Sequence, residues 1–137
     1  MRTHTNPLYG AARLIHLRGL HRGDQFAAVQ RLDVCAAVYL ATEGGPVPAL
    51  FFTDECASLE LIEASDRAMA AIRAISAALD TEPCETNGQP DYIEHVSNWA
   101  ATPPIGATQP PTTSEVIGCI LRAADTHAEQ TTTPHAA

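Results

Sequence analysis

Prolines divide the second half of this sequence into short segments. Six of the ten prolines fall in two stretches, TEPCETNGQP (residues 81–90) and TPPIGATQPP (residues 102–111). Proline lacks the amide hydrogen that an interior helix position must donate, and it also restrains the residue before it. Both stretches are therefore predicted to be loops. They bracket one compact segment, residues 91–101, which is predicted to be helical.

Helix caps predict two helices in the first half of the chain. Asn6 is a good N-terminal cap, Pro7 suits the first helical position, and Gly19 is typical of a helix end. Asp33 can cap a second helix, which runs to about Thr42 before the sequence EGG ends it. Between these helices, periodicity does not distinguish an irregular connection from a short extended segment.

The second predicted helix has no polar face. No charged residue occurs from Val34 to Ala41, so a helix here must be surrounded by the rest of the protein. We therefore predict that it is the central element of the fold. A buried strand is the alternative, because short apolar runs are compatible with both.

A helical seam is predicted between Asp54 and Asp80. Its positions step alternately by four and three residues: Leu61, Ser65, Ala68, Ile72, Ile75 and Leu79. The segment is either one long helix or two helices, the second beginning at Ser65. Such a seam more often packs in the core of its own chain than at a dimer interface. The PVPALFF sequence before it is predicted to be a proline-stiffened connection.

Two further helix starts are predicted in the second half. Asp91 and Glu94 form a D-x-x-E pattern, and Thr112 and Glu115 form a T-x-x-E capping box before VIGCILRAADTHAEQ. The sequence shows no convincing hairpin, no alternating strand series and no internal repeat. We therefore predict an all-α, single-domain bundle of about five helices with two Pro-rich loops, spanning residues 1–130, and a disordered tail at residues 131–137.

Composition excludes several classes of function. The chain has sixteen acidic residues and eight basic residues, all of them arginine, so its net charge is -8. A nucleic-acid-binding protein must neutralise several phosphates, so we do not expect nucleic acid as a partner. The acidity also argues against a polybasic membrane anchor. No apolar run is long enough to span a membrane. The expected location is the cytoplasm, where the four cysteines would be thiols.

Cys35 is a weak candidate nucleophile because it lies at a helix N-terminus, where reactive thiolates are often found. Its helical face is apolar, however, and the neighbouring Asp33 would raise the pKa of the thiol. A packed core cysteine is the competing interpretation. His95 is the other weak catalytic candidate, since Asp91 lies four residues before it and can orient its ring.

No metal site is predicted from local motifs. The sequence has no CxxC pair, no HxxxH pair and no clustered cysteine and histidine. A site would need His95 to converge with Cys35, Cys56 or Cys119 from separate helices, and the weak candidate ligands are Cys35, His95 and Cys119. No phosphate-binding glycine motif and no GxSxG motif occurs, so no cofactor is predicted.

Weak candidates for contact with a partner come from the seam and from the only tryptophan. Leu61, Ala68 and Ile72 lie on the seam, and Trp99 ends a predicted helix just before a proline loop. An indole at such a place usually closes the edge of a core, although it could also anchor a partner protein.

Four segments together resemble a family of small uncharacterised proteins from actinobacteria and their phages, known as a domain of unknown function. They are AARLIHLRGLHRG, the cysteine-led block VCAAVYLA, NWAA, and TSEVIGCILRAA, and they span roughly residues 11–124. This chain departs from the family pattern in two places, with alanines inside the cysteine-led block and an asparagine before the tryptophan. The resemblance implies no established activity and supplies no catalytic residue.

The functional hypothesis from sequence is a small acidic binding or regulatory protein that acts through contact with a protein partner or by self-association. The expected setting is a phage or another mobile element. The hypothesis depends on the lack of a catalytic signature and on the apolar seam. The alternatives are a Cys/His-dependent enzyme or metal-binding protein, and a structural or assembly protein.

Overall fold

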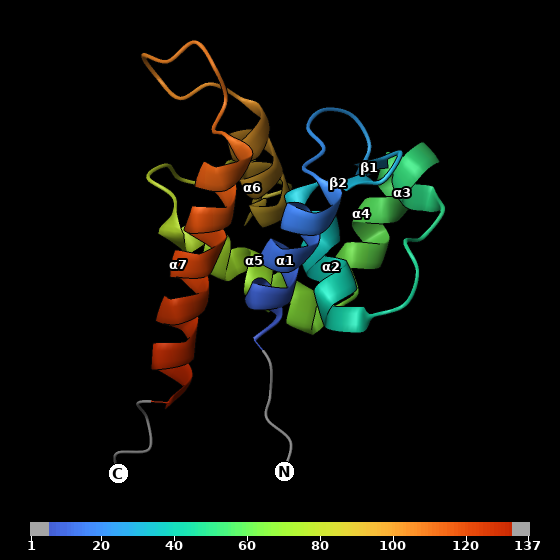
Figure 1. Ribbon diagram of the computed structural model, residues 1–137, viewed down its shortest axis with the longest axis horizontal. Coiled ribbons are helices and arrows are strands. Elements are labelled where there is room, and N and C mark those ends of the chain that lie inside the picture. Colours follow the sequence, from blue (N-terminus) through green and yellow to red (C-terminus); the bar gives the residue numbers. More distant parts are fainter. Residues whose placement is uncertain (1–5, 133–137) are drawn as a thin grey trace.

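Helices dominate the computed structural model, which describes residues 6–132 and, from residue 127 onward, only the course of the backbone (Figure 1). The helices are α1 (Pro7–Arg18), α2 (Val34–Glu43), α3 (Leu50–Thr53), α4 (Glu55–Glu63), α5 (Asp66–Ala78), α6 (Tyr92–Ala101) and α7 (Thr113–Thr132). The strands β1 (Ala27–Ala28) and β2 (Arg31–Leu32) form one antiparallel hairpin, and β3 (Glu85–Thr86) and β4 (Gln89–Pro90) form another. The prediction of a mostly helical chain is confirmed. The predictions of about five helices and of no hairpin are wrong for the described residues.

Side-chain caps start the first two long helices as the sequence predicts. Asn6 Oδ1 accepts a hydrogen bond from the Leu8 amide (2.9 Å), and Asp33 Oδ2 accepts one from the Cys35 amide (2.7 Å). Each bond satisfies one of the amide hydrogens that the first turn of a helix leaves without a partner. Gly19 ends α1 at a φ of 95°, in a region that favours glycine. Because residues Val34–Glu43 form α2, the alternative of a buried strand after Asp33 is excluded.

The uncharged helix α2 lies at the centre of the core. Its first five residues have no exposed surface, and the helix packs against α1, α4, α5 and α6. The approach of α1 to α2 is close at Gly10, where a Cβ atom would lie 3.0 Å from the Ala41 Cβ. The small side chains of both helices therefore set the spacing of this pair.

The seam between residues 54 and 80 forms two helices rather than one. Ser65 caps α5, because its Oγ accepts a hydrogen bond from the Ala68 amide (3.1 Å). Ala68, Ile72 and Ile75 are completely buried, so the seam packs within this chain. The preceding proline-containing segment is more ordered than predicted, since it includes α3 and buries Phe51 in the core.

Residues 20–32 combine an irregular connection, with bends at residues 23–26, and the short β1–β2 hairpin, and they fold onto the core. The Phe26 amide donates to the carbonyl of Phe51 (2.9 Å), and the two rings pack with centroids 5.9 Å apart. The second hairpin turns at Asn87 and Gly88, whose φ angles of 55° and 79° suit a two-residue hairpin turn.

The last helix packs against the first. The capping box at its start is confirmed, since Thr112 and Glu115 exchange backbone-to-side-chain hydrogen bonds of 2.8 and 3.1 Å. Near its other end, Asn6 Nδ2 donates to the carbonyl of Ala124 (3.2 Å) and Tyr9 donates to Asp125. The helix is described to Thr132, and most of the predicted tail, residues 133–137, lies outside the described part of the chain.

Arg22 holds the second Pro-rich loop in place. Its Nε donates to the carbonyl of Ala100 (2.9 Å), and its guanidinium also donates to the carbonyl of Pro111 (2.6 Å). The two ends of the loop at residues 102–111 are thereby joined through one side chain. Within the described residues, no helix has both the length and the apolar character that a bilayer crossing requires.

Candidate functional site

A pocket of about 290 Å³ lies between α6, the start of α4 and the segment before β1. Its polar lining consists of four carboxyl groups and three neutral side chains: Asp33, Glu55, Asp91, Glu94, Gln25, Ser97 and Asn98. Apolar contacts come from Phe26, Leu59, Ile93 and Ala101. No arginine or histidine is among the lining residues, so the pocket has a strongly negative character. We call it the acidic pocket.

One face of α6 forms a wall of the acidic pocket. Glu94, Ser97, Asn98 and Ala101 follow each other at three- and four-residue steps, which places them on the same side of a helix. Asp91 precedes them as the cap of α6, and its Oδ1 accepts a hydrogen bond from the Glu94 amide (3.0 Å). The cap that starts the helix therefore also supplies a carboxylate to the pocket.

Asp33 lies on the floor of the acidic pocket. It is 5% exposed, and its Oδ2 accepts hydrogen bonds from the Cys35 amide (2.7 Å) and from Ser97 Oγ (3.0 Å). Burial raises the pKa of its carboxyl group to about 6, although these two hydrogen bonds and the charge of His21 act in the opposite direction. A buried carboxyl group with a raised pKa in a pocket is a frequent mark of a functional site.

Gln25 brings an unsatisfied acceptor to the same place. Its side-chain Oε1 is buried and has no hydrogen-bond partner within the described residues. Its φ of 69° lies in the left-handed region, which is uncommon for a non-glycine residue. A buried acceptor without a partner costs about 1–3 kcal/mol. A rotation of the side chain that brings this oxygen to the pocket surface would let a ligand donate a hydrogen bond to it and remove the cost.

Cys35 lies beneath the acidic pocket and is completely buried. Its sulfur donates to the carbonyl of Ile93 (3.8 Å), and Ser97 Oγ lies 3.6 Å from the sulfur. Burial, followed by the charge of Asp33, raises the pKa of the thiol well above its usual value. The thiol therefore stays protonated, and the arrangement favours the packed-cysteine interpretation over a nucleophile.

His95 lies on the opposite face of α6 from the residues that contact Cys35. Ser76 Oγ lies 2.6 Å from its Nδ1, and Thr81 Oγ1 lies 2.7 Å from its Nε2. Both ring nitrogens are thus occupied by hydroxyl groups, and the side chain is 6% exposed. The ring ties α6 to α5 and to the loop that follows it. The structure does not bring Cys35 and His95 together.

Cys119, the third candidate ligand, lies on α7 away from both. Burial raises the pKa of its thiol, while the nearby Arg122 lowers it. Among the described residues, no three histidine, cysteine, aspartate or glutamate side chains are placed to hold a metal ion.

The candidate partner-contact residues divide into two groups. Ala68 and Ile72 are completely buried, so they contact no partner in this fold, because the seam is part of the core. Leu61 and Trp99 are half-buried and pack against the edge of the core. The acidic pocket itself was not predicted from sequence. The spacing of Asp91, Glu94 and Asn98 was the available signal.

Comparison with known proteins places the chain in a group without an assigned role. The model of a family of unknown function (DUF6197) matches residues 2–126. No curated protein and no solved structure gives a significant match.

Proposed function

The chain belongs to this family of unknown function, which confirms the resemblance drawn from its sequence. For its role, we propose that it is a binding protein that acts through protein contact. The acidic pocket is the proposed site, and the proposed ligand is a positively charged side chain of the partner. The observation that carries this proposal is the convergence of four carboxyl groups and one unsatisfied acceptor in a single pocket.

The size of the pocket favours a single side chain. At about 290 Å³ it is at the lower end of the range for small-molecule sites, which is roughly 300–1,000 Å³. A guanidinium or ammonium group would enter it, with its aliphatic stem against Phe26 and Leu59. Arginine suits the lining best, because its planar group can donate to a carboxylate and to an amide oxygen such as Gln25 Oε1 together.

The charge of the whole protein supports the same ligand. A net charge of -8 attracts basic partners over a distance and raises the rate of encounter at low ionic strength. Because Asp91 and Glu94 lie at the rim and Asp33 on the floor, a cation would meet negative charge along its whole path. The affinity of a basic ligand should therefore fall as salt is added.

Titration of the isotopically labelled protein with Nα-acetyl-arginine methylamide, followed by NMR, tests this function. We expect amide shifts at Gln25, Glu94 and Asn98, and we expect the uncharged citrulline analogue to cause much smaller ones. Glu55→Gln should weaken binding. Glu60→Gln is a matched control, because Glu60 is exposed on the same helix but does not line the pocket. Equal shifts with both ligands, or none at the pocket, would refute the proposal.

The other hypotheses from sequence stay predictions. A Cys/His-dependent enzyme receives no support from the separate positions of Cys35 and His95. A structural or assembly role predicts self-association, which sizing chromatography measures directly. The cytoplasmic location and the phage or mobile-element setting are likewise predictions.

A further inference from the structure

A second surface combines exposed apolar side chains with positive charge. The end of α1 and the β1–β2 hairpin line a groove of about 420 Å³, formed by Leu17, Arg18, Gly19, Val29, Gln30 and Arg31. Leu17 is 62% exposed and Val29 is 83% exposed, so both aliphatic side chains face solvent. We call this surface the hairpin groove.

Val29 occupies a backbone position that is unfavourable for its residue type. Its φ is 55°, and a β-branched side chain is a genuine outlier in the left-handed region. Glycine or asparagine would form this hairpin turn at lower cost. Since most of the side chain is exposed, packing within the chain does not account for a valine at this place. Such strain is often retained at functional sites.

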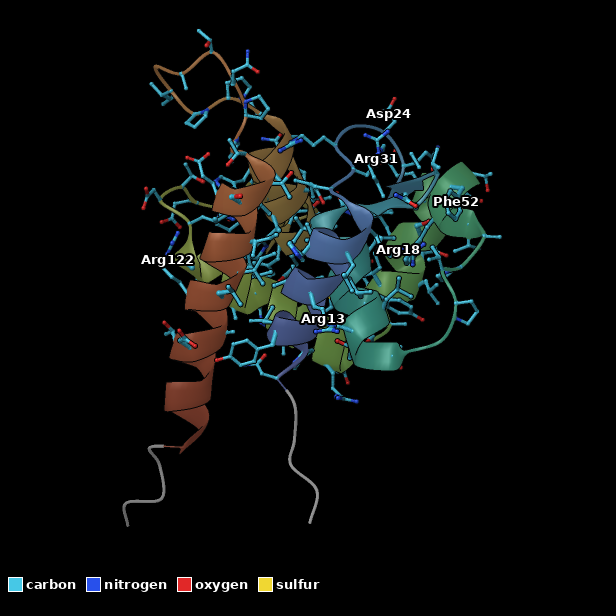
Figure 2. The ribbon with its side chains drawn as sticks, viewed as in Figure 1. Arg13, Arg18, Asp24, Arg31, Phe52 and Arg122 are labelled. Atoms are coloured by element: carbon cyan, nitrogen blue, oxygen red, sulfur yellow. The ribbon has the colours of Figure 1, made fainter. Side chains whose placement is uncertain are left out.

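Arginines gather around these aliphatic side chains. Arg18 and Arg31 line the hairpin groove, and Arg13 lies one helical turn before Leu17 on the same face of α1. In Figure 2 Arg13, Arg18 and Arg31 lie along α1 and the neighbouring hairpin, whereas the labelled Arg122 lies on α7. Arg18 Nε donates to the carbonyl of Gln30 (3.0 Å), a contact with a neutral acceptor that orients the side chain. The lining residues include no carboxylate.

We propose that the hairpin groove docks an acidic segment of a partner protein, with apolar side chains of that segment covering Leu17 and Val29. Charge complementarity identifies the occupant, because three of the eight arginines of a protein with a net charge of -8 gather here. Acidic groups of the segment would pair with Arg13, Arg18 and Arg31. This inference does not rest on the acidic pocket, which selects ligands of the opposite charge.

Other occupants fit these observations less well. Three arginines neutralise too few phosphates for firm binding of nucleic acid, and exposed aliphatic side chains add little to a phosphate contact. A symmetric contact between two copies would place this arginine-bearing surface against the identical surface of the second copy, since a two-fold interface uses the same patch on both subunits. Repulsion between like charges opposes that arrangement.

Selection from a library of random 16-residue peptides on the full-length protein tests the proposal. We expect enriched peptides to combine aspartate or glutamate with leucine, isoleucine or phenylalanine. For one such peptide, fluorescence polarisation should show that Leu17→Gln lowers the affinity about tenfold, the range expected for loss of an apolar anchor. Arg18→Gln should also lower it and should reduce the salt dependence.

Val29→Asn separates a binding role from a structural one. We expect this variant to raise the melting temperature by a few degrees, because asparagine tolerates a positive φ, and to weaken peptide binding. A purely structural role would leave binding unchanged. Leu121→Gln is the matched control for Leu17→Gln, since Leu121 is an exposed leucine on α7 at a distance in sequence, and it should bind as the wild type does.

Four results would overturn the proposal. The first is enrichment of basic peptides only. The second is unchanged peptide affinity in both Leu17→Gln and Val29→Asn. The third is that no acidic peptide binds, whereas a 15-nucleotide single-stranded RNA binds in a way that depends on Leu17. The fourth is concentration-dependent dimerisation that Leu17→Gln abolishes, which would identify a second copy as the occupant. None of these results bears on the binding of arginine at the acidic pocket, so the two proposals fail separately.

Discussion

Ser97 Oγ donates a hydrogen bond of 3.0 Å to Asp33 Oδ2, across 64 residues of sequence. The same carboxylate oxygen caps α2 through the Cys35 amide. One carboxyl group therefore starts the central helix, contacts α6 and forms the floor of the acidic pocket. Its protonation state affects both the stability of the fold and the charge of the pocket.

The stability of the protein should depend on the ionisation of Asp33. The pKa of this carboxyl group is about 6 in the folded chain, whereas the ordinary value for an aspartate, which applies to the unfolded chain, is 3.8. The folded state therefore binds the proton more tightly. Stability contributed by this group is therefore greatest at low pH and is lost as the pH rises from about 4 to about 6. The loss amounts to about 3 kcal/mol.

Asp33→Asn tests this dependence, because asparagine keeps an acceptor for the Cys35 amide and has no charge to bury. Urea unfolding between pH 4 and 8 should show that the variant gains stability relative to the wild type by about 3 kcal/mol over that range. The comparison with wild type cancels the titration of the other carboxyl groups. A difference that stays constant with pH would show that Asp33 does not titrate in this way.

Removal of the Ser76 hydroxyl should destabilise the fold. Ser76→Ala leaves Nδ1 of the buried His95 without a partner, and an unsatisfied buried polar atom costs about 1–3 kcal/mol. Chemical denaturation at pH 7.5 measures the effect. Ser114→Ala is the control, because Ser114 is exposed at the start of α7, and we expect a change within about 0.5 kcal/mol there. Equal stability of both variants would contradict a role for this hydrogen bond.

The four free cysteines should react with a thiol reagent in a fixed order. Cys56 and Cys84 are exposed, whereas Cys35 and Cys119 are buried and should react only when the protein unfolds. Cys84 should react more slowly than Cys56, because its hydrogen bond to Glu94 Oε1 (3.2 Å) raises the pKa of its thiol.

Glu94→Gln should speed the reaction of Cys84 and leave the reaction of Cys56 unchanged. Kinetics with Ellman's reagent on single-cysteine variants would assign each phase. Rapid labelling of Cys35 in the native protein would show that the site beneath the acidic pocket opens, and would restore the nucleophile hypothesis.

Helix starts were predictable because they depend on residues close in sequence. Asn6, Asp33 and Thr112 each cap a helix through an amide within three residues, so a short sequence window contains the whole interaction. The uncharged run after Asp33 likewise predicted a buried helix, because such a run has no face to present to water. The break at Ser65 was one of two interpretations, and its hydroxyl resolves it.

The hairpins were missed for two different reasons. Asn87 and Gly88 form a pair that is typical of a tight hairpin turn, and this signal was present in the sequence but outweighed by the surrounding prolines. The turn at Val29 has no such signal, since valine disfavours a positive φ. Contacts with distant residues, such as that between Phe26 and Phe51, hold this segment against the core.

The acidic pocket depends on contacts between residues far apart in sequence. Asp33 and Ser97 come together only because α2 and α6 pack against each other, and single-sequence periodicity does not predict which helices become neighbours. The same holds for His95, whose partners Ser76 and Thr81 lie on α5 and on the loop that follows it. The sequence therefore pointed to Asp33 and His95 but not to the side chains that bind them.

The hydrogen bond between Asn6 and Ala124 closes the described chain into a loop, since it joins residues 118 positions apart. A circular permutant that links these two regions and opens the chain at the exposed residues 103–109 should keep the same core. In Figure 1 the beginning of α1 and the far end of α7 lie on the side of the molecule away from the β1–β2 hairpin. An attachment tag near either region would therefore leave both proposed binding surfaces free.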